Sequence, residues 1–479
     1  MKLLPKANHN SFVGNSALIF LSRFFPTLAS AGVAIYFSHR LDTSVYGTYV
    51  NFWTRLFLVS TFAGLGLQGF LITYTPSTIA GLLKTLRSKH YAMLLAWLLA
   101  TSAVFAFMEN DVLGSLLSAM FLAVYVSSIV IDALLMAFRS LRVLIVLNLL
   151  YAVLFAYVHV LFVNGTLDFA QLFYSLLIVS VLKLIVSLFV LLKDMKQQVV
   201  DIDSMPPGAD IRSLWMHMGI YDVSQVVFKW IDKFIIGWLF TESVSAIYFN
   251  GSNDVPFLPL LMGAVGSAAL MQLSADKSEE APIVVMNKSG RILSSVVFPL
   301  FFFLVFFRYE LFHIVFSKQY DQSVPIFLAS IMVLPLRAYN FTVVLQNRHK
   351  GRIINIGAVI DLAIACILMY PLYLLMGLPG VAFSFVVSTY LQAGYYLYQT
   401  SRILNVSWGK LLPMVNWAIK LIVFCFLFIV IHYLLAAYYT PQIVLICGMI
   451  LAALISGISF IFELRATKAK YGAVRETKV

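Results

Sequence analysis

Charged residues are scarce in this sequence. Lysine, arginine, aspartate and glutamate make up 11% of its 479 positions, whereas soluble globular domains carry roughly 25%. The longest clearly polar stretch, residues 193–212, is too short to enclose a hydrophobic core of its own. The sequence therefore predicts no soluble domain.

Cysteines are few, and the common catalytic motifs are missing. The three cysteines, Cys366, Cys425 and Cys447, all lie in apolar runs, and their spacing suggests neither a disulfide framework nor a metal site. The sequence contains no GKS/T phosphate loop, no HExxH and no GxSxG, which are motifs of nucleotide, zinc-protease and serine-hydrolase chemistry. We therefore predict that the protein is not an enzyme and uses no metal or cofactor.

Long apolar runs are abundant. Hydrophobic residues make up 61% of the chain, and the mean hydropathy is +0.91. Because about 20 apolar residues suffice to cross a bilayer as a helix, the sequence predicts an all-α polytopic membrane protein with about fourteen transmembrane helices. The expected spans are roughly 12–38, 45–74, 91–108, 112–138, 143–163, 170–192, 213–239, 246–272, 291–312, 322–345, 352–372, 379–399, 412–437 and 441–463.

Lysine and arginine are concentrated in alternate loops. One example is the loop after the second span, which contains Lys84, Arg87 and Lys89, whereas the loops on the other side are short and poor in both residues. The positive-inside rule then predicts that both the N- and C-termini are cytoplasmic. Most of the net charge of +12 is explained by this orientation, so no nucleic-acid partner is predicted.

Two short segments suggest an internal repeat. TSVYGTYVN begins at Thr43, ESVSAIYFN begins at Glu242, 199 positions later, and the two are identical at four of nine positions. Six spans separate them, which predicts two six-helix lobes in a parallel pseudo-repeat around a central cavity. The predicted divisions are an N-lobe at 1–200, a C-lobe at 201–405, two additional spans at 406–463 and a basic cytoplasmic tail at 464–479.

Arg23 and Arg55 lie inside the first two spans. A charge near the bilayer centre costs about 2.5–3.5 kcal/mol on insertion scales, so it tends to persist only in a polar interior. One hypothesis is that both arginines line a basic cavity for an anionic substrate. The other is that they form internal ion pairs with no ligand role, for which Asp132 in the fourth span is a candidate partner.

Span seven carries a second group of charges. Asp222, Lys229 and Lys233 follow one helical line, and Asp232 flanks it. These side chains either line the same cavity or neutralise one another, as Lys229 and Asp232 would at a spacing of three residues.

Four further ionisable residues lie in or near other spans. Arg337 and Asp361, in spans ten and eleven, form either a static pair or a proton site. Lys183 and Lys420 have long side chains within reach of the membrane interface, so we expect them to snorkel.

The repeat relates positions in the two lobes. With the offset of 199, Arg23 corresponds to Asp222 and Arg55 corresponds to Asp254, so an anion on the N-lobe wall would face aspartates that exchange a proton or a sodium ion. The candidate residues for binding an anionic head group are Arg23, Arg55, Lys229, Lys233 and Arg337. The candidates for ion coupling are Asp132, Asp222, Asp232, Asp254 and Asp361.

Two motifs carry a family resemblance. RLDTSVYGTYVNFWTRLF follows the first span, and VVFKWIDKFIIGWLFTESVSAIYFN contains the Asp232-Lys233 pair, Gly237 and the Ala-x-Tyr at 246–248. They resemble the polysaccharide (O-antigen type) flippases of the multidrug/oligosaccharidyl-lipid/polysaccharide flippase superfamily. Peptidoglycan-precursor flippases of that superfamily have important arginines in spans one and two, where Arg23 and Arg55 lie here.

The resemblance implies a function and a location. It implies a flippase in the bacterial inner membrane that exports undecaprenyl-diphosphate-linked oligosaccharide repeat units by alternating access between two lobes, for surface polysaccharide, O-antigen or lipopolysaccharide biosynthesis. The implied partners are this lipid-linked oligosaccharide and membrane lipid, together with a proton or sodium counter-ion and a polysaccharide polymerase. In the precursor flippases the last two spans form a groove for the lipid tail, and spans thirteen and fourteen here are candidates for the same role.

Two alternatives remain open. A multidrug-extrusion type antiporter, coupled to cations and carrying small molecules, belongs to the same superfamily. It predicts a cavity dominated by carboxylates and aromatic residues, against which the arginines count. A membrane-embedded glycosyltransferase would need a large outer loop, and the expected outer loops have only a few residues.

Overall fold

The computed structural model describes residues 12–74, 76–109, 114–196, 208–253, 258–275, 278 and 280–476, and every regular element in these ranges is a helix. The chain forms two compact units, unit 1 (Met1–Ser245) and unit 2 (Ala246–Val479). The prediction of an all-α fold is confirmed.

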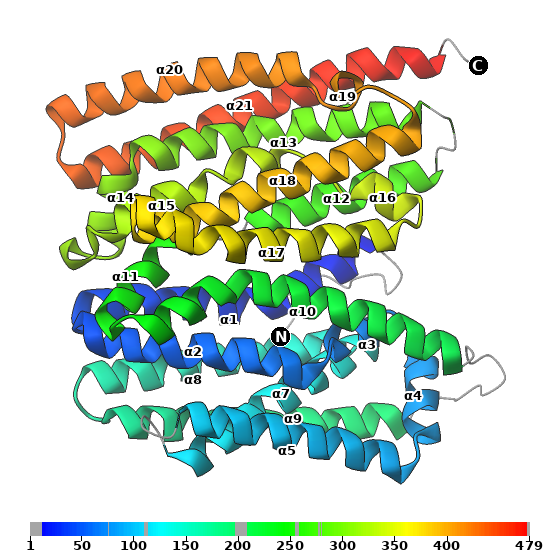
Figure 1. Ribbon diagram of the computed structural model, residues 1–479, viewed down its shortest axis with the longest axis vertical. Coiled ribbons are helices and arrows are strands. Elements are labelled where there is room, and N and C mark those ends of the chain that lie inside the picture. The colour runs from blue at the N-terminus through cyan, green and yellow to red at the C-terminus, as the bar shows by residue number, and fades with distance from the viewer. Residues whose placement is uncertain are drawn as a thin grey trace, which may run out of the picture. The chain divides into compact units, whose positions relative to one another are not determined.

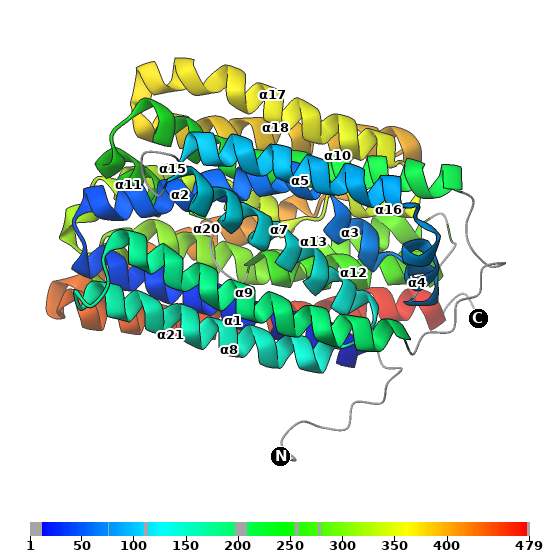
Figure 2. The same ribbon diagram turned by 90° about the horizontal axis from the view of Figure 1, so that it is seen from below.

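Unit 1 consists of long helices that pack side by side (Figures 1 and 2). Helix α1 packs on α8, α8 on α9, α7 on α5 and α9, and α10 on α2 and α3. In Figure 1 the short helix α4 runs crosswise to the long ones. The helices are α1 (Phe12–Arg40), α2 (Thr43–Gly64), α3 (Leu67–Ile72), α4 (Pro76–Thr85), α5 (Ser88–Met108), α7 (Ser115–Ala137), α8 (Leu141–Val163), α9 (Phe169–Lys196) and α10 (Gly208–Leu239).

Unit 2 is built around α13, which packs on α12, α20, α21 and η2, while α17 packs on α18. Helix α11 (Glu242–Gly251) begins in unit 1 and ends in unit 2. The other helices are α12 (Leu258–Ala275), α13 (Ala281–Phe306), α14 (Arg308–Val315), η1 (Lys318–Tyr320), α15 (Ser323–Ile331), η2 (Leu334–Ala338), α16 (Val343–Asn347), α17 (Gly351–Met376), α18 (Leu378–Leu404), α19 (Trp408–Leu411), α20 (Met414–Tyr438) and α21 (Pro441–Glu476).

Many helices expose apolar side chains, as a multi-pass membrane protein requires. On α20, Ile422 and Phe426 are each 71% exposed, which suits contact with lipid tails. Within the described ranges, eight helices are long and apolar enough to cross a membrane, namely α5, α7, α8, α9, α13, α17, α20 and the Pro441–Thr467 part of α21. The other expected spans coincide with the more polar helices α1, α2, α10 and α18 and with interrupted helices.

Four expected spans are interrupted, which corrects the prediction of continuous helices. The second divides between α2 and α3, the eighth between α11 and α12, the ninth between α13 and α14, and the tenth into α15, η2 and α16. Pro335 lies in η2, where its missing N–H and fixed φ oppose a regular α-helix.

The break between α2 and α3 has a clear local cause. Leu65 and Gly66 adopt left-handed φ values of 48° and 68°, which end the α-helical hydrogen bonding. The indole Nε1 of Trp215 donates to the freed carbonyl of Leu65 at 2.8 Å. Gly66 also lies directly against the backbone of Gly219, where a Cβ would clash. The two glycines let α10 approach the break closely.

The two segments of the suggested repeat both begin helices, at the equivalent residues Thr43 and Glu242. Their ends touch, because the Thr43 hydroxyl donates to the Ser243 hydroxyl at 3.1 Å and Gly47 lies against the Glu242 carbonyl. Helix α10 packs within unit 1, although the repeat assigned it to the second lobe. The two compact units are defined by packing, whereas the predicted lobes are defined by the sequence repeat. The unit boundary therefore does not test the lobe limits, which stay a prediction.

A buried ion network joins the last two helices to α13. Glu463 of α21 accepts from Arg291 Nε at 2.9 Å, from Lys420 Nζ at 3.0 Å and from Asn416 at 2.8 Å. Lys420 is only 8% exposed and also donates to the Arg291 carbonyl. The expectation that Lys420 snorkels to the interface is wrong, because a buried carboxylate and a carbonyl satisfy its ammonium inside the protein.

Replacing Gly66 with alanine should destabilise unit 1 by at least about 2 kcal/mol, because a Cβ disfavours a positive φ and would clash with Gly219. Gly64→Ala is the matched control, since a Cβ at Gly64 meets no atom within 4 Å. The melting temperatures of the two purified variants measure the difference, and equal values would contradict this account of the break.

Candidate substrate-binding site

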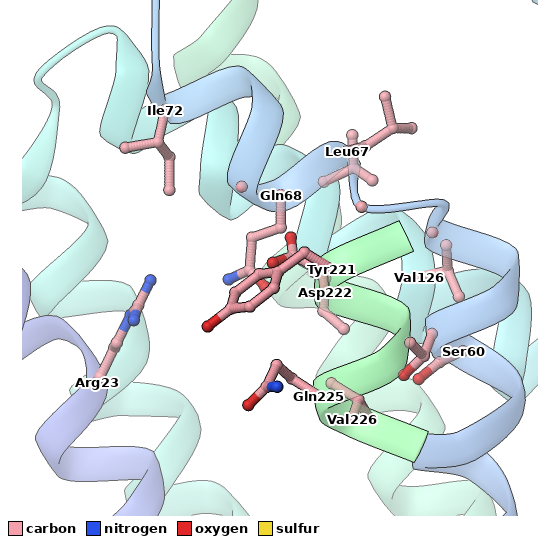
Figure 3. Close-up of a pocket in the computed structure, with 16 residues that line it drawn as sticks. Arg23, Ser60, Leu67, Gln68, Ile72, Val126, Tyr221, Asp222, Gln225 and Val226 are labelled. Carbon is pink, nitrogen blue, oxygen red and sulfur yellow. The ribbon is translucent and has the colours of Figure 1, made fainter. Parts of the chain in front are cut away.

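A cavity of about 390 Å³ lies in unit 1 (Figure 3). Its walls come from α1, from the break between α2 and α3, from α7 and from α10. The interrupted span therefore shapes one wall. The cavity is lined by Arg23, Ser60, Thr61, Gly64, Gly66, Leu67, Gln68, Gly69, Ile72, Val126, Ile129, Val130, Tyr221, Asp222, Gln225 and Val226.

Arg23 is the cation of this cavity. Its side chain is exposed and projects from α1 into the open space (Figure 3). None of the ion pairs in the described part of the chain involves its guanidinium. The five N–H donors of a guanidinium suit two-point binding of phosphate or carboxylate, so Arg23 is available to an anionic ligand.

The opposite side of the cavity carries polar groups of α10. Tyr221, Asp222 and Gln225 face the space across from Arg23 (Figure 3). The Asp222 carboxylate lies against Gly69, where a Cβ would come within 2.5 Å of Oδ2. The absence of a side chain at position 69 thus makes room for the carboxylate. The structure brings together Arg23 and Asp222, the two residues that the repeat made equivalent.

The charge distribution of the cavity determines what it can hold. One guanidinium and one carboxylate lie on different walls, the neutral polar groups include those of Ser60, Thr61 and Gln68, and most of the remaining lining is apolar. An anion would bind on the Arg23 side, while hydroxyl groups or a cation would bind on the Asp222 side.

Arg55 has a different environment. Its guanidinium pairs with the carboxylate of Glu109 at 2.9 Å, and Glu109 is 1% exposed. Arg55 is not among the residues that line the cavity. The suggestion that Asp132 neutralises an arginine is wrong, because Asp132 pairs with Lys183 at 2.7 Å. The same bond corrects the expectation that Lys183 snorkels.

The charges of span seven are also distributed differently. Asp232 and Lys233, both buried, form an ion pair at 3.2 Å. Lys229 is exposed and its ammonium lies 5.4 Å from the centre of the Trp230 ring. None of these three charged residues lines the cavity of Arg23.

The remaining candidates lie elsewhere. Arg337 lines a smaller cavity of about 160 Å³ in unit 2, together with Asn340, Gln392 and other residues. Asp361 of α17 is 5% exposed and lies outside that lining. Asp254 falls outside the described residues.

The sequence alone did not single out Glu109, Glu463 or Asn148 as functional partners. Glu109 was assigned to a loop, yet it is buried against Arg55. Asn148 is the one polar residue in an otherwise apolar stretch of span five, LIVLNLLYAV. That interruption is the signal that could have identified Asn148, which donates to the Ser22 carbonyl of α1.

These helices form a transporter fold. The structure is similar to that of the lipid II flippase MurJ in an inward closed conformation, with a TM-score of 0.66 and 13% identity over 96% of this chain and 99% of that one. No known family profile and no curated protein matches the chain.

Two other solved structures share the fold over 82% of this chain. One is an inward-facing multidrug resistance MATE transporter of the MOP superfamily, with a TM-score of 0.55, 13% identity and 98% of that chain covered. The other is a MOP superfamily transporter from Pyrococcus furiosus Vc1, with a TM-score of 0.54, 14% identity and 95% of that chain covered. The likeness shows the MurJ- and MATE-like fold.

Replacing Arg55 with leucine should leave the buried Glu109 without its cation and destabilise unit 1 by about 3 kcal/mol. The double variant Arg55→Leu/Glu109→Leu should recover most of that loss, because neither charge then remains. Thermal unfolding of both variants measures the coupling. Two independent, additive losses would show that the pair does not stabilise the fold.

Proposed function

We propose that this protein is a flippase for a lipid-linked anionic substrate. The single observation that carries the proposal is Arg23, whose guanidinium has no ion-pair partner among the described residues and lines a cavity between helices of a fold shared with a membrane flippase. A charged side chain within a membrane-spanning segment is energetically costly, and those that occur commonly mark a ligand or ion pathway. The similarity in fold to a lipid II flippase supports the same class of substrate.

The proposed substrate is an oligosaccharide repeat unit linked to a polyprenyl diphosphate. The diphosphate would bind Arg23 through charge-assisted hydrogen bonds, and the polyprenyl tail would stay in lipid. Sugar hydroxyls would meet the Asp222, Gln225 and Gln68 side chains. Arg55, Lys229, Lys233 and Arg337 belong to the proposal as secondary sources of positive potential along the path.

The proposal includes the cellular setting and the cycle. The protein would lie in the bacterial inner membrane with both termini in the cytoplasm and supply a polysaccharide polymerase on the far side. Two lobes would alternate access, and a proton or sodium ion bound at Asp222 or another of the predicted aspartates would drive the cycle. No chemical step on the substrate is needed, so the protein would act as a transporter and not as an enzyme.

One observation favours a second candidate, a MATE-like antiporter for small cations. Asp222 and the phenol of Tyr221 line the same cavity and would suit a cationic aromatic ligand. Members of this fold differ in pocket charge, since the Pyrococcus furiosus transporter is described as having a binding pocket of reverse polarity. The charge of the transported molecule distinguishes the two candidates.

Arg23→Ala should lower transport of an undecaprenyl-diphosphate-linked sugar by about 100-fold, because a two-point guanidinium–phosphate contact contributes about 3 kcal/mol. Arg23→Lys should keep part of the activity, since lysine retains the charge but not the fork. Transport into proteoliposomes that contain the purified full chain is the measurement.

Arg402→Ala is the control, because Arg402 lies in the last turn of α18 and is not among the residues that line the cavity, so this variant should transport normally. Equal transport by wild type and Arg23→Ala would contradict the proposal. Export of a cationic dye that needs Asp222 but not Arg23 would instead establish the antiporter.

A further inference from the structure

In an α-helix the carbonyl of residue i accepts from the N–H of residue i+4. Pro26 lies inside α1 and has no N–H, so it cannot supply this hydrogen bond to the Ser22 carbonyl. Backbone polar groups in the apolar part of a membrane protein are satisfied within the protein, so a side-chain donor can take the place of the missing N–H.

Asn148 of α8 supplies that donor. Its Nδ2 donates to the Ser22 carbonyl oxygen at 2.8 Å, and the two residues are 5% and 0% exposed. The amide oxygen of Asn148 is buried and has no hydrogen-bond partner among the described residues. The side chain therefore retains an unsatisfied polar atom, and the bond it makes is the one to α1.

This bond lies one residue before Arg23. Successive residues of a helix point about 100° apart, and Ser22 is buried while Arg23 is exposed to the cavity. Thr27 and Ser30 also donate to carbonyls of this stretch, those of Arg23 and Pro26, a pattern that bends helices. The Asn148 side chain therefore hydrogen-bonds α8 to the stretch of α1 that contains Pro26, one residue before Arg23.

Another buried polar residue of α8 provides a contrast. Nδ1 of His159 donates to the Phe155 carbonyl at 2.6 Å, and Nε2 accepts from the Tyr49 hydroxyl at 2.8 Å. These bonds lie within the aromatic core of unit 1 and do not involve α1. Of these two residues of α8, Asn148 is the one that hydrogen-bonds to α1, at the residue before Arg23.

We propose that Asn148 is a positioning residue for anion binding: by donating to the Ser22 carbonyl, to which Pro26 cannot supply the usual helical N–H, it fixes the rotation of α1 that aims Arg23 into the cavity. The proposal rests on the proposed function, in which Arg23 holds the anionic head group. Asn148, which is uncharged and lies outside the cavity lining, would thus affect the affinity for the substrate.

The test compares affinities for undecaprenyl diphosphate in nanodiscs of phosphatidylethanolamine and phosphatidylglycerol. Asn148→Leu keeps the approximate volume and removes the donor, and it should weaken binding about tenfold, by allowing α1 to turn. In an Arg23→Ala background the same change should produce no further loss, because its effect acts through Arg23. Asn287→Leu is the matched control, since Asn287 donates to the Lys410 carbonyl in unit 2, and its affinity should equal that of wild type.

A second variant separates positioning from stability. In Pro26→Ala/Asn148→Leu the new N–H of Ala at position 26 reaches the Ser22 carbonyl, so the melting temperature should rise above that of Asn148→Leu. Affinity should stay about tenfold below wild type, because the hydrogen bond from residue 148 of α8 to the Ser22 carbonyl of α1 is still missing. If Asn148→Leu alone does not fold, this double variant still shows whether loss of the Asn148 side chain lowers affinity in a stable protein.

Two results would overturn the positioning role. The first is that Asn148→Leu binds with wild-type affinity although its melting temperature is lower. The second is that Pro26→Ala/Asn148→Leu recovers both its melting temperature and its affinity. Wild-type affinity in Arg23→Ala would be a different failure, because it would reject the proposed function itself.

Discussion

A membrane interior offers no water, so each charge and each backbone polar group has to find its partner within the protein or its ligand. In unit 1 this constraint produces the pairs Arg55–Glu109 and Lys183–Asp132. In unit 2 it joins Glu463 to two cations at once. Arg23 stands apart from these pairs, because its guanidinium projects into a cavity. In the proposed function, an anionic ligand supplies the partner that this constraint requires for Arg23.

The cavity owes its shape to irregular helices. Left-handed φ values at Leu65 and Gly66 end α2, and the nearby Gly219 allows α10 to pack against the break. Pro26 removes a hydrogen bond from α1 close to Arg23. The carbonyls of Leu65 and Ser22 at these irregularities accept from side chains of other helices, Trp215 and Asn148. The break between α2 and α3 contributes part of the cavity wall, including Gly66 and Leu67.

Hydropathy predicts where most of the helices lie, because the length and polarity of a span depend on local sequence, but it does not predict the interruptions within four of the expected spans. Helical periodicity and the repeat also drew attention to Arg23 and Asp222, and both line the cavity. The partners of the charged residues were not predicted: Lys183 was expected at the interface but pairs with Asp132, and Glu109, which does lie beyond the end of α5, is buried against Arg55. Partner choice depends on which helices are neighbours, and periodicity within one helix carries no information about that. The break at Leu65 was missed because no proline marks it.

The central claim is that Arg23 makes this cavity a site for an anionic lipid head group. Its most direct test is the equilibrium affinity of the wild-type chain in nanodiscs for three lipids with the same tail, undecaprenyl diphosphate, undecaprenyl phosphate and undecaprenol. The account predicts that affinity falls in that order as the head group loses negative charge, with the steepest loss for the neutral alcohol. Equal affinity for all three lipids would contradict it.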